Sequence, residues 1–290
     1  MDMLLRQLYQ DQAGKEDTCA ILVLRKDDSS FLSTDGFDAI ILLISDHVKD
    51  WQSKHYEAVG KRIAFHTMSQ EMMHHSLITG NQRRLIDWLV NGRIVYDRNE
   101  FMQDVKFRID SFPPGDRSKK LTIQFAKLLR RFEEGKTLFQ QGFILDGFSN
   151  LFHALHHLAR MAVIKDGFYP EVTVWEQVKK IEPEIHKLYQ EALNSEEALD
   201  KRIELLILAL GVAIHSKLEL GASHFLEQLR SIEGEATISE MLSLPEVQEY
   251  RIDLELMLNT LVEKGCVSLV KRETPAKSIY QTKYVIENYN

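Results

Sequence analysis

The residues best suited to chemistry gather around Asp38, which opens the apolar run 39–44 (AIILLI). Asp35 stands three residues earlier, and Asp28 lies further upstream in a polar stretch. Carboxylates on neighbouring strands can hold Mg²⁺ against a triphosphate, and a tight turn can bring backbone N–H groups to the phosphates. Asp38 is therefore a candidate catalytic residue and metal ligand. The plainer alternative is a turn residue or strand-edge acid.

Other acidic and basic residues could bind a nucleotide or another cofactor. Asp35, Asp28 and Asp97 are the acidic candidates, although Asp97 follows the run IVY and also fits a simple turn acid. Arg130 is the basic candidate, because it belongs to a cationic helix face that could contact ligand phosphates. The other members of that face are Lys127, Arg131 and Lys136. A solvated helix face is the default interpretation of such a pattern.

A histidine pair offers a separate candidate metal site. His153 and His157 are four residues apart on a predicted helix and could face one another, with His156 beside them. No carboxylate completes the motif, so interface or core histidines are the favoured interpretation.

The first 117 residues mix strand and helix signals. Runs rich in Ile, Leu and Val predict two strands buried on both faces, with two shorter strands further on. The predicted strands are 18–25, 37–45, 62–69 and 92–97. The predicted helices are 4–10 and 47–61, the latter ending at Gly60, and the stretch 70–91 predicts one or two more helices. Alternating strands and helices predict an α/β unit with a mixed sheet.

Two further domains follow the Pro113-Pro114-Gly115 triplet, which interrupts regular structure. Apolar residues at three- and four-residue intervals predict a helical bundle over 118–232. The segment 233–290 predicts a winged helix-turn-helix. Its expected parts are a short helix capped by Thr237 with Glu240, one continuous helix over 245–265, and a β-hairpin. The predicted domains are therefore 1–117, 118–232 and 233–290.

Composition limits the class of protein. The chain has 290 residues and a net charge of −7, which argues against coating nucleic acid through bulk charge. No stretch approaches the roughly 18 apolar residues of a membrane span, and the acidic N-terminus lacks a secretory signal. The two cysteines, Cys19 and Cys266, predict buried thiols in a reducing compartment. We expect a cytoplasmic protein without a membrane partner.

The first domain resembles the nucleotidyltransferase superfamily. The stretch GFDAIILLI is similar to that family's Asp-x-Asp strand, with Asp38 on the second aspartate and Gly36 on the first. The family's Gly-Ser turn falls on LRKDD, and its third acid falls on RIAFHTMS, where His66 is the nearest polar residue. The strand GRIVYD resembles the segment that closes the family's sheet, and the helical domain resembles the partner domain of these enzymes.

The three-part layout resembles bacterial proteins described as nucleotidyltransferase-like. That resemblance implies a nucleoside triphosphate and Mg²⁺ as ligands, in a cleft between the first two domains. Only one of three expected carboxylates is matched, so a degraded metal site with weak or no transfer activity is the favoured prediction. An active enzyme using Asp35, Asp38 and Asp28 is the alternative.

The rival function is that of a regulatory or scaffold protein acting through its winged helix on DNA or a protein. The predicted second helix of that domain is net acidic, which disfavours reading of DNA. The predicted wing is basic, with Lys271, Arg272, Lys277 and Lys283. We therefore favour a protein partner, or self-association through the winged helix or the helical domain.

Overall fold

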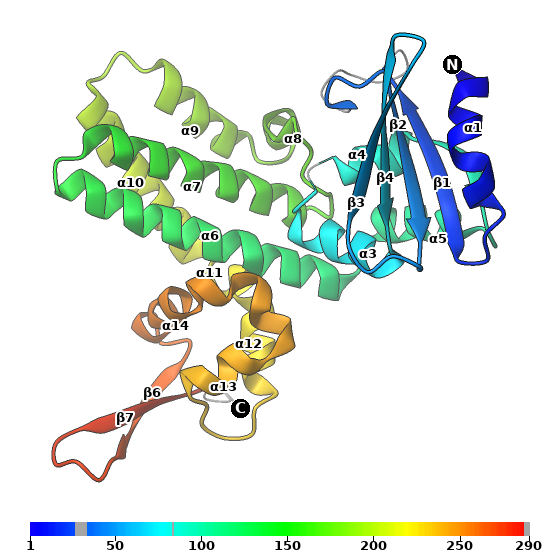
Figure 1. Cartoon of the computed structure of the whole chain (residues 1–290). Coiled ribbons are helices and arrows are strands. Elements are labelled where there is room, and N and C mark those ends of the chain that lie inside the picture. The colour runs from blue at the N-terminus through cyan, green and yellow to red at the C-terminus, as the bar shows by residue number, and fades with distance from the viewer. Residues whose placement is uncertain (27–33, 83, 287–290) are drawn as a thin grey trace. The chain divides into compact units, whose positions relative to one another are not determined.

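The computed structural model describes residues 1–26, 34–82 and 84–286 of the chain (Figure 1). The chain divides into two compact units, Met1–Pro113 and Pro114–Asn290. The first unit contains the larger sheet, and the second contains a helical bundle followed by a helix-turn-helix region with a β-hairpin. The predicted fold class, a mixed sheet with helices and then two further helical regions, is confirmed.

The first unit is built on a five-stranded sheet with the order β3-β4-β2-β1-β5. Its strands are β1 (Thr18–Arg25), β2 (Ala39–Ser45), β3 (Gln52–Ala58), β4 (Lys61–Met68) and β5 (Arg93–Asp97). β2 pairs with β4 in parallel, while the other pairs are antiparallel, so the sheet is mixed as predicted. Every residue of β2 is buried, which explains its unbroken apolar sequence.

The helix predicted over 47–61 is wrong. Residues 52–58 instead form the edge strand β3, which pairs antiparallel with β4 along its whole length. Val59 and Gly60 both have positive φ, at 52° and 67°, so they make the hairpin turn between the two strands. Six of the seven β3 residues are exposed, and pairing with β4 overrides their weak local preference.

Helices cover both faces of this sheet (Figure 1). They are α1 (Asp2–Ala13), α3 (Gln70–Thr79), α4 (Leu85–Asn91) and α5 (Phe101–Ser111). On one face, Leu5 of α1 packs into a core with Ile21 and Ile41. On the other, Gly92 ends α4 so close to Leu22 that a Cβ there would lie 3.0 Å from that side chain. The stretch 70–91 forms two helices, α3 and α4, which is one of the two arrangements that its sequence predicted.

The helical bundle begins with a long antiparallel pair. The helices are α6 (Pro114–Gln140), α7 (Ile144–Lys165), α8 (Val174–Ile181), α9 (Pro183–Asn194), α10 (Leu199–Ser216) and the short α11 (Leu218–Gly221). A Cβ on Gly135 of α6 would lie 2.7 Å from the Leu151 side chain of α7. Glycine at this crossing therefore lets the two helix backbones approach closely.

The C-terminal region has the element order of a winged helix. It comprises α12 (Ser223–Arg230), α13 (Ile238–Ser243), the 3₁₀ segment η1 (Pro245–Asp253), α14 (Leu254–Glu263), β6 (Ser268–Glu273) and β7 (Tyr280–Val285). Ala236 bridges to Tyr284 and adds a short third strand segment. Thr237 and Glu240 form the predicted capping box at the start of α13.

The prediction of one continuous helix over 245–265 is wrong in its first half. Residues 245–253 are 3₁₀, and the α-helix begins only at Leu254. Tyr250 leaves helical geometry with φ −128°, and its hydroxyl lies 2.9 Å from Nδ1 of buried His224. Burial of this tyrosine against α12 explains the break, which no local sequence signal marks.

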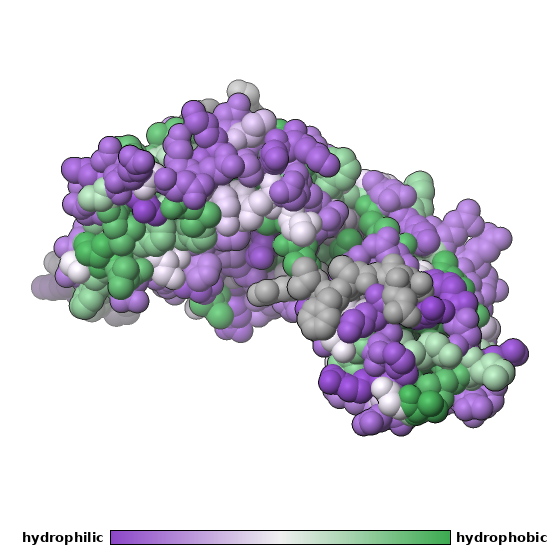
Figure 2. Space-filling model, turned by 90° about the horizontal axis from the view of Figure 1, so that it is seen from above, coloured by the Kyte–Doolittle hydropathy of each residue, from purple (hydrophilic) through white to green (hydrophobic). Residues whose placement is uncertain are grey.

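Among the described residues, no helix is long and apolar enough to cross a bilayer. On the face seen in Figure 2, hydrophilic side chains predominate and apolar side chains form separate patches.

Candidate functional site

Asp38 lies where the strands β1, β2 and β4 meet. Its backbone N–H donates to the Arg62 carbonyl at 2.8 Å, and its own carbonyl accepts from Lys26 N–H at 3.0 Å. Its carboxylate accepts from the Arg62 backbone N–H at 2.9 Å and from Lys61 Nζ at 3.0 Å. The Arg62 hydrogen bond, followed by Lys61, lowers the pKa of Asp38. Both carboxylate oxygens are therefore engaged in joining β2 to β4.

This end of the sheet is rich in cations. β1 ends at Arg25 and is followed by Lys26, and β4 begins with Lys61 and Arg62. The Arg62 guanidinium lies 5.0 Å from the centre of the Phe37 ring. Repulsion from such neighbours opposes binding of a divalent cation.

The described residues do not fit a Mg²⁺ site around Asp38. Mg²⁺ is usually held by carboxylates together with waters and substrate phosphates. Within the described ranges, no group of three His, Cys, Asp or Glu residues could hold a metal ion. Asp28, the loop residue suggested as a replacement ligand, lies outside the described residues, as does Asp27.

The other acidic candidates have structural partners of their own. Asp35 stands in the turn before β2 with φ 52°, and its carboxylate pairs with Arg84. Asp97 accepts a hydrogen bond of 3.1 Å from the backbone N–H of Met102, near the start of α5. Asp97 pairs with Ala20 near the start of β1, whereas Asp38 precedes β2 beside the other end of β1, where Arg25 pairs with Ala39. The structure therefore does not bring Asp97 and Asp38 together.

His66, the nearest polar residue on the strand where the resemblance predicts a third acid, is part of a ring cluster. Its Nδ1 lies 2.7 Å from the Ser53 hydroxyl, and its ring stacks on Trp88 with centroids 5.2 Å apart. Burial lowers its pKa to about 4, with a further contribution from His55. A neutral, stacked imidazole is a packing element here.

The histidines of α7 do not assemble a metal site within the described part of the chain. His153 is exposed, whereas His157 lies with Nδ1 2.9 Å from Gln124 Oε1. Burial lowers the pKa of His157 to about 3, and the nearby Arg160 and Lys127 add to the effect. The neutral ring joins α7 to α6.

These histidines lie beside a group of cations that we call the α6–α7 basic cluster. It consists of Lys120, Lys127, Arg130, Arg131 and Arg160. Lys120, Lys127 and Arg131 recur at intervals of seven and four residues, which places them on one face of α6. Sequence reasoning identified the middle of this cluster, including Arg130, but missed Lys120 and Arg160. The seven-residue spacing between Lys120 and Lys127 could have placed Lys120 on the same helix face.

Lys120 is the most unusual member of the cluster. It is 5% exposed, and its Nζ lies 5.4 Å from the centre of the Tyr169 ring. Burial lowers its pKa to about 7, and repulsion from Lys127 and Arg160 contributes. The pKa of Lys127 is also lowered, by burial and by Arg160 and Arg130. Cations that disfavour one another in this way form a strong local positive potential.

Two members of the cluster contact polar groups on neighbouring segments. Arg131 Nη1 lies 2.8 Å from Asn150 Oδ1 of α7 and 3.4 Å from Glu134 Oε2. Arg130 Nη1 lies 3.3 Å from Asp253 Oδ1, at the end of η1. The cluster therefore joins α6 to α7 through Arg131 and α6 to the winged helix through Arg130.

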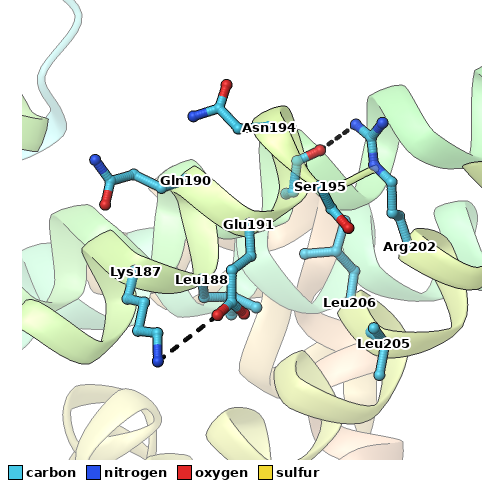
Figure 3. A pocket seen from close by; sticks show the side chains of 10 residues that line it. Lys187, Leu188, Gln190, Glu191, Asn194, Ser195, Arg202, Leu205 and Leu206 are labelled. Carbon is cyan, nitrogen blue, oxygen red and sulfur yellow. Dashed lines mark hydrogen bonds and ion pairs between the residues drawn. The ribbon is translucent and has the colours of Figure 1, made fainter. Parts of the chain in front are cut away.

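A pocket of about 590 Å³ lies between α9 and α10 of the same unit (Figure 3). Its lining combines Leu205 and Leu206 with polar side chains from both helices. Arg202 donates to the Ala192 carbonyl, and Lys187 pairs with Glu191 at 3.7 Å. The pocket is a second concave candidate for a ligand.

The mixed sheet with an aspartate at the head of its second strand, the helical bundle and the helix-turn-helix region together define a nucleotidyltransferase-like protein. Family models agree, region by region. Residues 1–117 match a model described as nucleotidyltransferase-like, residues 118–217 match a YgxA-like substrate binding domain, and residues 223–286 match a helix-turn-helix domain.

Two similar proteins cover almost the whole chain. The uncharacterized protein YgxA of Bacillus subtilis (strain 168) is 38% identical over 288 residues, which are 98% of this chain and 97% of that protein. The crystal structure of a nucleotidyltransferase-like protein from Exiguobacterium sibiricum 255-15 matches with a TM-score of 0.84, at 32% identity and 99% coverage of both chains. The chain belongs to this family of YgxA-like, nucleotidyltransferase-like proteins.

Proposed function

We propose that this protein binds a nucleotide, or a related phosphorylated anion, through the α6–α7 basic cluster, with weak or no nucleotidyl transfer. The observation that carries the proposal is the gathering of five cationic side chains on two adjacent helices, one of them a buried lysine. Their region matches a substrate-binding type of domain. In the proposed complex, nucleotide phosphates lie against the cluster.

The electrostatics of the cluster favour an anionic ligand. Burial and mutual repulsion lower the pKa of Lys120 to about 7, so a large fraction is neutral near that pH. A bound phosphate would offset the repulsion from Lys127 and Arg160 and raise this pKa. We therefore expect proton uptake when the ligand binds between about pH 7 and 9.

The surroundings of Asp38 support weak or absent transfer. A metal-dependent transfer needs carboxylates that can coordinate Mg²⁺, whereas the Asp38 carboxylate accepts from Lys61 and from Arg62. An active enzyme would need Asp28 or another donor to complete a site. That alternative predicts Mg²⁺-dependent labelling of an acceptor.

Thermal unfolding with ATP, GTP, CTP and UTP tests the proposal, each with and without Mg²⁺. A ligand at about 100 times its dissociation constant adds roughly 2.7 kcal/mol to the unfolding free energy, which raises the midpoint. We expect a rise without Mg²⁺ that is lost in the double variant Lys127→Gln, Arg160→Gln. The control is Lys201→Gln, which removes one cation whose side chain is 60% exposed on α10. A rise that survives in the double variant would refute the proposed site.

A role as a regulatory or scaffold protein acting through the winged helix is the second candidate. The exposed face of η1 and α14 carries Glu255 and Glu263 with Arg251, and Ile252 on it is 84% exposed. In the wing, Arg272 pairs with Glu235. An acidic face with an exposed isoleucine suits a protein partner better than DNA. Binding of duplex DNA at low salt that falls with added salt would favour DNA instead.

A further inference from the structure

We propose that the ligand site on α6 and the winged helix compete for the same cations, so that an anionic ligand loosens η1 from α6. This inference rests on the proposed function, because it concerns regulation of the same basic cluster. The Asp253 carboxylate of η1 would act as an internal anion that holds Arg130 of the cluster until a ligand phosphate replaces it.

Two ion pairs attach η1 to α6. Arg130 Nη1 lies 3.3 Å from Asp253 Oδ1, and Lys119 Nζ lies 2.6 Å from Glu246 Oε2. The Asp253 side chain is only 8% exposed, and that of Lys119 is 20% exposed. Asp253 and Glu246 stand at opposite ends of η1, so the two pairs hold the whole segment along α6.

Asp253 lies within the electrostatic reach of the cluster. Burial raises the pKa of its carboxyl group, while Arg130 and Lys127 lower it. In the opposite direction, Asp253 and Glu249 raise the pKa of Lys127. One carboxylate therefore already offsets part of the repulsion among the cations that the proposed ligand would contact.

A phosphate group is a stronger competitor than this carboxylate. A phosphomonoester carries about −1.5 to −2 charge at pH 7 and three acceptor oxygens, and Arg binds it through paired hydrogen bonds. If Arg130 turns toward a phosphate, Asp253 is left buried beside Glu134, whose charge also raises its pKa. Such an uncompensated carboxylate favours opening of η1 toward water.

The movement is limited to the two ends of η1, because the middle of the segment is held by other contacts. Val247 is fully buried, and the Tyr250 hydroxyl lies 2.9 Å from Nδ1 of His224 on α12. These contacts keep the winged helix attached while the ends of η1 loosen. The exposed face that η1 forms with α14 would then change its shape. Ligand binding at the cluster could in this way alter the affinity of the winged helix for a partner.

Thermodynamic linkage makes the coupling between ligand binding and the η1–α6 contact reciprocal. If the ligand weakens the contact between η1 and α6, then removing that contact strengthens ligand binding by the same factor, commonly between about 5-fold and 150-fold. Asp253→Asn should therefore bind ATP at least about 5-fold more tightly than the unaltered chain. Glu255→Gln is the matched control, because Glu255 is exposed on α14 and its substitution makes the same change in charge.

Two measurements on the full chain decide the matter. Calorimetry gives the affinity for ATP in the unaltered chain, Asp253→Asn, Glu246→Gln and Glu255→Gln. Hydrogen exchange with mass spectrometry follows residues 245–254 with and without ATP. We expect tighter binding in the first two variants only, and faster exchange of η1 when ATP is bound.

The outcomes separate the two proposals. ATP binding with equal affinity in all four proteins, and unchanged exchange in η1, would overturn the competition while leaving the proposed function intact. Failure of every protein to bind ATP would overturn both. Glu246→Gln guards against misfolding of Asp253→Asn, because its carboxylate is about half exposed.

Discussion

Replacing Lys120 by methionine should stabilise the protein while weakening its affinity for an anion. Methionine matches the unbranched lysine stem as far as Cε but lacks the charged ammonium group. The pKa of Lys120 falls from 10.5 to about 7 on folding, mainly through burial, so the folded state disfavours the protonated form. A buried lysine that costs stability in this way is a candidate for binding an anion.

The size of the effect follows from linkage. A difference of one pKa unit corresponds to about 1.36 kcal/mol, so an interval from 10.5 to about 7 amounts to about 5 kcal/mol. At pH 7 about 4 kcal/mol of this is expressed, because half of the folded molecules are already protonated there. Above pH 10.5 the lysine is neutral in both states, and the penalty vanishes. The destabilisation therefore grows as the pH falls from 10.5 toward 7 and is constant below that.

Urea unfolding between pH 6 and 10 measures this directly. Lys120→Met should gain several kcal/mol of unfolding free energy at pH 7, and its advantage should shrink as the pH rises toward 10. The control is Lys180→Met on α8, an exposed lysine that should change stability by less than about 0.5 kcal/mol. A loss of stability at pH 7, or an advantage that does not depend on pH, would refute the reasoning.

Three further predictions concern packing, capping and titration. Gly221→Ala should lower the free energy of unfolding in urea by about 1–3 kcal/mol, because the new Cβ would lie 2.4 Å from Cγ of buried Phe125. The control Gly115→Ala, which has open space around its Cβ, should not lower it by this amount. Thr237→Ala should cost about 1 kcal/mol by removing the capping box of α13, measured in the same way, and an unchanged midpoint would contradict this. The pKa of His157 falls from 6.5 to about 3 on folding, so stability should decline as the pH falls from 6.5 toward 3, and His157→Gln should remove that part of the slope in acid unfolding curves.

The core of the first unit could be predicted because its signal is local. The apolar runs of β1 and β2 are buried on both faces, and a continuous run of Ile, Leu and Val indicates such a strand. The edge strand over 52–58 could not, because six of its seven residues are exposed and nothing in its sequence marks pairing with β4. Likewise, the break at Tyr250 depends on burial against His224, a residue 26 positions away.

The candidate site was predictable only where sequence position fixes geometry. Asp38 was placed at the head of β2, but its two partners, Lys61 and Arg62, come from the register between β2 and β4. The sequence predicts a solvated lysine at position 120, because lysine is rarely buried. Its burial follows from packing that the sequence does not show, and so does the position of Arg160 beside it.

The central claim, that a nucleotide binds at the α6–α7 basic cluster, is tested most directly by calorimetric titration with ATP. The proteins to titrate are the unaltered chain, Asp38→Ala, and the double variant Lys127→Gln, Arg160→Gln. Each titration is done with and without Mg²⁺. The account predicts binding that needs no Mg²⁺, persists in Asp38→Ala and is lost in the double variant. Binding that requires Mg²⁺ and disappears in Asp38→Ala would contradict the account. It would indicate that the nucleotide binds at Asp38, beside the start of β2.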